Sequence, residues 1–381
     1  MSDSIKSCNQ FQHWFAQSAL PLWGAHGYDH SHGGFYEALD FTGSPVTGQP
    51  RRVRVQARQI YTFTQSALRG WGNEHEDLAA KGFEFLLDRA CPENGQRGCV
   101  HTLLDDGTIL DDRRDLYDQA FLLLACAARW KAVKDKRAMA VINATIDFLD
   151  AELSSPHGGW LESDKGEIPR RQNPHMHLFE AFITLFEGTR DHRYLNKAHE
   201  IYRLFESSFY DATNGVVREF FDAKLAPLQS RDGDLIEPGH MAEWVWLLDR
   251  YARCGGHVTE GIMDKLFVGT GSMGVDKQGF LRDSISLQYD NPAQTRRLWP
   301  QIEYVKAALV MAQHGRSGAA VKATQMINQI FDTYLNQPVA GLWCDQYQVS
   351  GERLAQNVPA SILYHLFEAA ADASDYVIAS E

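Results

Sequence analysis

Six glycine-containing turns recur along this 381-residue chain at nearly constant spacing. Each turn places a glycine beside an aromatic or apolar residue and is followed by a short strand-like run. The marker glycines are Gly34, Gly98, Gly159, Gly215, Gly279 and Gly341, at intervals of 64, 61, 56, 64 and 62 residues. A fixed period of this length indicates one repeated supersecondary unit, which constrains the fold more than any local motif does.

Apolar residues with a helical period lie on both sides of each marker glycine. The helices expected before the markers span 8–20, 77–90, 136–153, 194–209, 257–268 and 317–335. Those expected after the markers span 54–70, 115–131, 175–188, 240–253, 302–314 and 360–372.

This alternation predicts an all-α fold in which six helix pairs close into a ring, an (α/α)6 barrel. An open solenoid is the alternative, although solenoid repeats are usually shorter and need capping units. No long linker or change of composition divides the chain, so we expect one catalytic domain over residues 1–381.

The composition argues against several classes of partner. The formal net charge is −12 and the pI is near 5.7, which disfavours nucleic acid and anionic membrane surfaces. The longest apolar run, residues 120–128, is too short to span a bilayer. The six cysteines lack metal-binding spacing, and the N-terminal segment lacks the apolar core of a secretory signal. We therefore expect reduced thiols and a cytoplasmic location.

One position near the start of each helix that follows a turn carries a side chain able to do chemistry. These residues are Arg58, Asp118, His177, His240, Glu303 and His365, separated by 60, 59, 63, 63 and 62 residues. Four of the helices also have a proline that suits a first helical turn, at Pro174, Pro238, Pro300 and Pro359. If the helices are equivalent staves of a barrel, these side chains converge at one end of its axis.

The segment NPHMH, residues 173–177, contains two histidines that cannot both face the axis. Residues two apart point to nearly opposite sides of a helix. His177 lies three residues after Pro174, at the depth that Glu303 has in its own helix, so we expect it to point inward. We expect His175 to cap the helix or to line the rim.

A purely structural role for these residues is the alternative. A lone histidine on an amphipathic helix is more often a satisfied core or surface residue than a catalyst. The structural roles in question are an ion pair for Arg58, backbone hydrogen bonds for Asp118 and Glu303, core packing for Tyr117 and a helix-surface charge for Glu180. The shared register favours the functional interpretation, because three of six equivalent positions carry histidine although the chain has only 15.

Two chemistries fit this set of side chains. His240 and Glu243, three positions apart, could bind Zn²⁺ or Mn²⁺ with two further histidines, but no pair has HExxH spacing. Metal-free proton transfer fits better, because histidine titrates near working pH and Arg58 can stabilise an oxyanion. The dipole of a helix N-terminus favours the neutral form of His177 and His240. We therefore expect no metal, and a site that removes a proton from carbon beside a carbonyl and returns it.

Two further functions stay open on the same barrel. A glycosidase needs two carboxylates that flank the scissile bond, but that chemistry does not ask for three central histidines. The candidates for such carboxylates are Asp118, Glu243, Glu303 and Asp345. A non-catalytic toroid that binds sugar or protein needs the cavity but no basic imidazole.

The helix starts RRQNPHMHLFEA, EPGHMAEW and WPQIEYVKA, together with VQARQIY and ILYH, resemble the N-acylglucosamine 2-epimerase superfamily. The resemblance covers essentially the whole chain, and its motifs are specific in combination. It implies an (α/α)6 barrel and proton transfer at C2 of an aldose, with neither metal nor cofactor. N-acylglucosamine epimerases generally lack the second histidine of NPHMH, and the chain is most similar to the mannose and sulfoquinovose isomerase branch.

The resemblance also implies a role for each candidate residue. His240 and His365 would be the acid–base pair, His177 would assist ring opening, and Arg58 would hold the oxygens of the enediolate. The residues implied to bind the substrate or to orient it and the histidines are Tyr117, Asp118, Asn173, Glu243, Trp299 and Glu303.

We therefore predict an aldose–ketose isomerase that converts the monosaccharide D-mannose to D-fructose through a cis-enediolate. A sugar 2-epimerase is the second interpretation, because returning the proton to the other face of C2 gives the epimer. Arg51, Arg52 and Arg54 would form an anion pocket if the sugar carried a sulfonate or phosphate. We expect neither nucleic acid nor membrane as a partner, and a homo-oligomer stays open.

Overall fold

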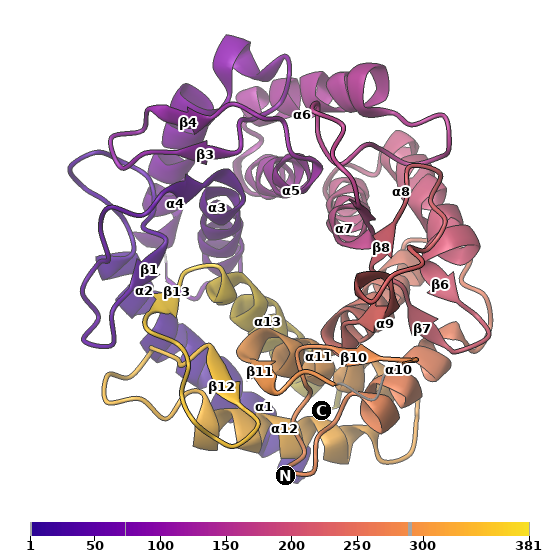
Figure 1. Ribbon diagram of the computed structural model, residues 1–381. Helices are drawn as coiled ribbons and strands as arrows, with labels where there is room; N and C mark the ends of the chain where they lie inside the picture. The colour runs from indigo at the N-terminus through magenta and orange to yellow at the C-terminus, as the bar shows by residue number, and fades with distance from the viewer. Residues whose placement is uncertain (1, 73, 289–291, 381) are drawn as a thin grey trace.

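Twelve long helical segments form two concentric rings in the computed structural model, which describes residues 2–72, 74–288 and 292–380 (Figure 1). The inner ring consists of the helices that follow the marker glycines: α3 (Val53–Leu68), α5 (Leu116–Val133), α7 (Gln172–Thr189), α9 (Pro238–Arg253), α11 (Leu298–Gln313) and α13 (Ile362–Ser380). These helices pack against one another in chain order, and α13 packs against α3, which closes the ring. The predicted (α/α)6 barrel is confirmed, and the open solenoid is excluded.

The outer ring consists of the helices that precede the markers. They are α1 (Asp3–Trp14) with α2 (Leu20–His26), α4 (Glu74–Phe85), α6 (Lys136–Phe148), α8 (His192–Leu204), α10 (Ile262–Met273) and α12 (Ala319–Thr333). Four of the outer segments include a π-helical turn, at Phe15–Ala19, Leu86–Ala90, Leu149–Leu153 and Phe205–Phe209. The first helix packs against α12 and α13, so the two ends of the chain complete the ring together.

Apolar side chains fill the space between the two rings. Outer helices bury one face, as α8 does, whereas inner helices such as α5 are buried on almost every side. An inner helix therefore has little surface left for polar residues except where it faces the barrel axis. Within the described ranges, none of the helices combines the length and the apolar character that crossing a membrane requires.

Short antiparallel strand pairs join each repeat to the next near the beginnings of the inner helices. The pairs are β2 (Arg51–Arg52) with β3 (Thr102–Leu103), β3 with β4 (Ile109–Asp111), β5 (Arg170–Arg171) with β8 (Phe220–Phe221), β6 (Tyr210–Asp211) with β7 (Val216–Val217), β9 (Leu235–Ile236) with β10 (Ile285–Ser286), β11 (Thr295–Arg297) with β12 (Gln346–Gln348), and β13 (Val358–Pro359) with β1 (Ala38–Leu39). In five of these pairs, the strand before one inner helix bonds a strand of the next repeat. The pairs hold the inner-helix N-termini around one mouth.

The marker glycines recur because the backbone of the turn requires them. All six have positive φ angles, between +60° and +92°, which glycine adopts without strain. At Gly98, a Cβ would lie only 1.9 Å from Oε1 of Gln119. This Gln119 side chain accepts from the N–H of Cys99 and donates to its carbonyl, both at 2.9 Å. The turn is thereby tied directly to the inner helix α5.

The same tie recurs in other repeats and explains His175. Gln56 and Gln301 bond backbone groups just after their own turns in the same way, at 2.6–2.8 Å. In the third repeat His175 takes this position: its Nε2 accepts from the N–H of Trp160 at 3.0 Å, and the ring is fully buried. His175 therefore secures the turn and does not line the rim, contrary to the expectation from the sequence.

Candidate active site

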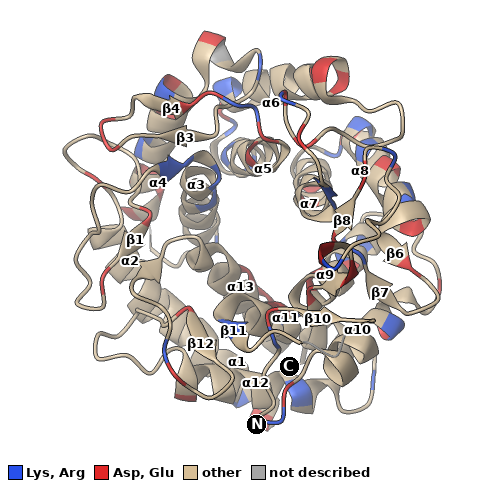
Figure 2. Cartoon of the chain, in the orientation of Figure 1, with Lys and Arg blue, Asp and Glu red and all other residues tan. Residues whose placement is uncertain are grey.

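A cavity of about 370 Å³ opens where the inner helices begin, a volume within the range of small-molecule sites. All six inner helices contribute to its wall, and charged residues of both signs occur on them near the axis (Figure 2). The lining residues are Arg52, Arg54, Arg58, Tyr117, Asn173, His177, Glu237, His240, Glu243, Arg297, Trp299, Asp345, Pro359, Ser361, Ile362 and His365. The predicted convergence of Arg58, His177, His240 and His365 is confirmed.

Side chains of five inner helices are arranged in two layers, one helical turn apart. The upper layer contains Arg54, Tyr117, Asn173, Trp299 and Ser361, and the residues four positions later are Arg58, Phe121, His177, Glu303 and His365. Residues four apart lie on the same face of a helix. Helix α9 departs from this register and presents His240 and Glu243, three positions apart.

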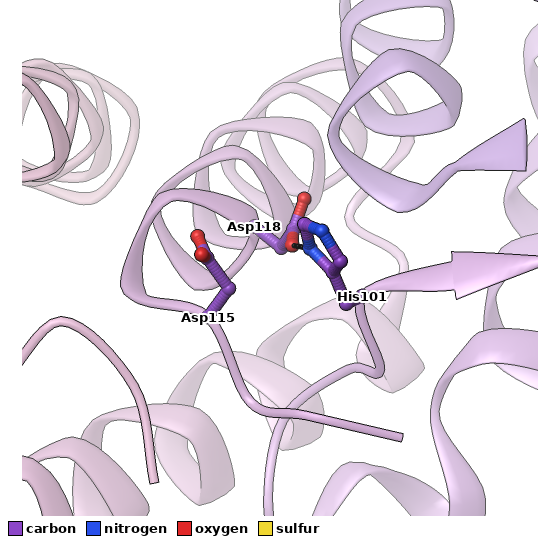
Figure 3. A group of neighbouring side chains, drawn as sticks. All are labelled: His101, Asp115 and Asp118. Atoms are coloured by element: carbon purple, nitrogen blue, oxygen red, sulfur yellow. Dashed lines mark hydrogen bonds and ion pairs between the residues drawn. The ribbon is translucent and has the colours of Figure 1, made fainter. Parts of the chain in front are cut away.

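Asp118 lies outside the lining, so its expected inward position is wrong. The side chain is fully buried and its Oδ2 accepts from Nδ1 of His101 at 2.6 Å, next to Asp115 (Figure 3). Its Oδ1 lies 3.3 Å from Nη1 of Arg54, which does line the cavity. The even spacing of about 60 residues hides a shift of one turn in α5, where Phe121 takes the position equivalent to Arg58.

Each of the three cavity histidines has a buried carboxylate beside Nδ1. The pairs are His177 with Glu180 at 3.1 Å, His240 with Glu219 at 3.0 Å and His365 with Glu303 at 2.7 Å. A carboxylate accepts, so Nδ1 donates in each pair and Nε2 is left as the second nitrogen of the ring. Glu180 is therefore not a surface charge, as its place in the helix pattern suggested: it is fully buried and also accepts from Tyr364.

The three histidines differ in charge although their contacts are alike. Burial opposes protonation of His240, but Glu219 and Glu237 outweigh it and raise its pKa to about 9. Burial lowers the pKa of His177 and of His365 to about 4 despite their carboxylate partners. At neutral pH His240 is thus an imidazolium, and the neutral form expected there from the helix dipole is wrong. Environments that push two pKa values apart identify an acid and a base.

Arg58 presents a fixed positive charge at the floor of the cavity. Its Nη2 donates to the Tyr117 hydroxyl at 2.9 Å, and its guanidinium carbon lies 4.2 Å from the centre of the Phe121 ring. Aromatic faces attract a cation without neutralising it, as a carboxylate would. The charge therefore stays available to an anion in the cavity.

Three lining residues have a buried oxygen without a hydrogen-bond partner among the described residues: Asn173 Oδ1, Glu243 Oε1 and Asp345 Oδ1. Burial, followed by the charge of Glu303, holds the pKa of Glu243 well above its usual range. Burial raises that of Asp345 to about 6. Buried polar atoms are normally hydrogen-bonded, so these groups are suited to a ligand with several hydroxyls.

Trp299 forms the wall between the acid and the base. Its ring centre lies 5.0 Å from that of His240 and 5.9 Å from that of His365. Glu303, in contrast, lies behind the wall with no exposed surface, where it contacts His365 and also Lys306 Nζ at 2.8 Å. Glu303 therefore orients a histidine and does not face the cavity.

Sequence reasoning missed Glu219, Glu237 and Arg297. Arg297 and Glu237 stand immediately before inner helices, and Glu219 lies in a connector, so none belongs to the register that was compared. Glu219 carries one signal that could have found it: it follows its marker glycine by four residues, as Asp283 does.

Four groups of three donors could hold a metal ion, each with its ligand atoms within 4.8 Å of one another. They are His101, Asp115 and Asp118 (Figure 3), His177, Glu180 and Glu243, Glu219, Glu237 and His240, and Glu243, Glu303 and His365. The closest histidine–carboxylate contacts in these groups are hydrogen bonds through Nδ1. Metal-free chemistry stays a prediction.

The ring of helix pairs and its histidine-lined, sugar-sized cavity define a carbohydrate-active (α/α)6 barrel. The model of the N-acylglucosamine 2-epimerase family matches residues 34–369, and the chain belongs to this family. It is 35% identical over 378 residues to a mannose-6-phosphate isomerase of Rhizobium meliloti, which covers 93% of each chain. It is 26% identical to a D-mannose isomerase of Thermobifida fusca over 75% of this chain and 74% of the relative.

The fold is shared with solved structures of the same class. The cellobiose 2-epimerase of Spirochaeta thermophila superimposes with a TM-score of 0.87 and 22% identity, covering 98% of this chain and 97% of that one. The protein is thus a sugar isomerase or epimerase, as the sequence predicted.

Proposed function

We propose that the protein is an aldose–ketose isomerase that interconverts D-mannose and D-fructose. The observation that carries the proposal is the pair of histidines on either side of Trp299: His365 is a neutral base and His240 a protonated acid at neutral pH. Abstraction of a proton beside a carbonyl needs both groups at once, because charge develops on oxygen as the proton leaves carbon.

Proton transfer proceeds in two balanced steps. His365 takes the proton from C2 of the open-chain aldose, and His240 gives a proton to O1, which leaves a neutral enediol. His240 then takes the proton from O2, and His365 returns its own to C1, so the ketose forms and both rings are restored. Arg58 stabilises the negative charge on the oxygens between the two transfers.

The remaining residues hold the sugar. His177, neutral and buried, accepts from a hydroxyl during ring opening, and Glu243 lies 3.8 Å from its Nε2. Asn173 and Asp345 accept from hydroxyls through their unpartnered oxygens. Tyr117 orients Arg58, and Trp299 presents an apolar face to the sugar ring.

A phosphorylated sugar is the second candidate, because the relative from Rhizobium meliloti is named a mannose-6-phosphate isomerase. Three arginines at the mouth could bind a phosphate, but each already has a carboxylate partner. The pairs are Arg52 with Glu37 at 2.7 Å, Arg54 with Asp118 at 3.3 Å and Arg297 with Asp283 at 3.1 Å. Because these charges are neutralised, we favour the free sugar.

The test is incubation of the purified protein with D-mannose in D₂O, with products and deuterium positions determined by NMR. Fructose with deuterium at C1 supports the proposal. Glucose with deuterium at C2 would instead indicate a 2-epimerase, and no turnover of any sugar would refute both. Parallel reactions with mannose 6-phosphate, cellobiose and N-acetylmannosamine compare kcat/KM, and a preference for the phosphate would overturn the choice of the free sugar.

A further inference from the structure

A carboxylate after the marker glycine clamps the start of the inner helix in three of the repeats. Glu37 accepts from the backbone N–H of Arg52 at 2.6 Å and from its Nε at 2.8 Å. Glu162 does the same to the N–H and Nε of Arg171, and Asp283 to those of Arg297. These carboxylates follow their glycines by three or four residues. They share one function, which is to fix the arginine that precedes the helix.

The fourth repeat has the carboxylate but not the arginine. Glu219 follows Gly215 by four residues, yet the residue before α9 is Glu237. The side chain of Glu219 turns instead into the barrel, where Oε2 accepts from Nδ1 of His240 and from Nε2 of Gln172, both at 3.0 Å. It is almost completely buried, and its carbonyl accepts from the N–H of Gln172.

The charges around His240 come from three elements. The connector supplies Glu219; α9 itself supplies Glu237, 3.9 Å from Nδ1, and Glu243. Arg297, next to α11, lies 3.7 Å from Glu237 and so offsets Glu237 rather than Glu219. The groups that face His240 from α11 and α13 are Trp299, which is uncharged, and the neutral His365 on the other side of it. Glu219 is thus the strongest direct partner of the ring.

We propose that Glu219 is a positioning residue: the clamp carboxylate of the repeat has been redirected from a helix-start arginine to His240, where it fixes the ring and keeps its proton in place. The proposal rests on the isomerase function for its catalytic meaning, but not for the contact. One replacement, arginine by Glu237, accounts for the change of partner, since it removes the cation that the carboxylate would otherwise bind.

The experiment compares Glu219→Gln with Glu162→Gln, which removes the equivalent clamp in the third repeat. Titration of the histidines by NMR without substrate should show His240 losing its proton near pH 9 in the wild type. In Glu219→Gln this midpoint should fall by more than one pH unit, and the alkaline limb of kcat should move by the same amount. Glu162→Gln should lower Tm but leave both the midpoint and the pH profile unchanged.

Glu219→Asp keeps the charge and should restore most of the alkaline midpoint. An unchanged His240 midpoint in Glu219→Gln would overturn the proposal, as would an equal shift in Glu162→Gln. If Glu219→Gln does not fold, a midpoint in Glu219→Asp that equals that of the wild type, together with unchanged KM and kcat, would overturn it too. A shifted midpoint in a protein that turns over no sugar would refute the isomerase function and leave the positioning role standing.

Discussion

His240–Glu219 and His365–Glu303 have the same contact and opposite protonation. In both pairs Nδ1 of a buried imidazole donates to a buried carboxylate, at 3.0 and 2.7 Å. The shorter pair has the lower histidine pKa, about 4 against about 9. A carboxylate neighbour therefore does not by itself set the charge of a histidine.

The difference comes from what else touches each carboxylate. Glu303 is shared with Lys306 at 2.8 Å, and Arg58 adds a second positive charge near His365. Glu219 is shared with the uncharged Gln172, and Glu237 adds a second negative charge near His240. The same dyad is therefore a base where cations surround it and an acid where carboxylates do.

Removing either imidazole should have the largest effect. His240→Ala and His365→Ala should each lower kcat by about 10²–10⁴-fold, the usual contribution of general acid–base groups. The measurement is steady-state turnover of mannose, with circular dichroism and Tm to show that the fold is intact. Turnover close to that of the wild type in either variant would refute its assigned role.

Lys306→Met should make the base side of the comparison resemble the acid side. Without this cation the pKa of His365 should rise from about 4 toward the ordinary value near 6.5, so the acid limb of kcat moves to higher pH. Loss of the buried partner should also cost about 3–5 kcal/mol of stability.

The control for Lys306→Met is Lys322→Met on α12, whose Nζ reaches only the Tyr304 hydroxyl at 3.4 Å among the described residues. Lys306→Arg, which keeps the charge, should keep the limb near its wild-type position. An acid limb that stays in place in Lys306→Met would show that Lys306 does not set the charge of His365.

The wild-type pH profile of kcat tests both dyads together. His365 must be neutral and His240 protonated, so activity should be level between limbs near pH 4 and pH 9. Each pH unit beyond a limb removes about nine-tenths of the active form, since a titrating group changes tenfold per unit. A maximum with a limb near pH 6.5 would mean that one histidine titrates as it does in water.

Stability should respond to pH in opposite directions through the two histidines. The folded pKa of His240 is raised, so its contribution is complete below about pH 6.5, the unfolded value, and is lost toward pH 9. The folded pKa of His365 is depressed, so its contribution is present above about pH 6.5 and is lost toward pH 4. In Tm measurements, His240→Gln should flatten the alkaline side and His365→Gln the acidic side.

The sequence was sufficient for the ring and for the convergence of Arg58, His177, His240 and His365, because a repeat period near 62 residues carries both. It failed for Asp118, because connector lengths vary and an interval of 60 residues looks like the true 63-residue step between Gln56 and Gln119. The charge of His240 was beyond its reach, because that charge depends on Glu219, a residue of a connector rather than of any helix.

The smallest effect is expected from chelation, and it bears on both sides of the comparison. Each dyad belongs to a group of three donors that could hold a metal, with Glu237 on one side and Glu243 on the other. A bound cation would cancel the carboxylates that keep His240 protonated, so acid and base would no longer differ. We therefore expect dialysis against EDTA to leave kcat and the pH limbs unchanged. Loss of activity that Zn²⁺ or Mn²⁺ restores would show that the metal, and not the balance of protein charges, prepares this site.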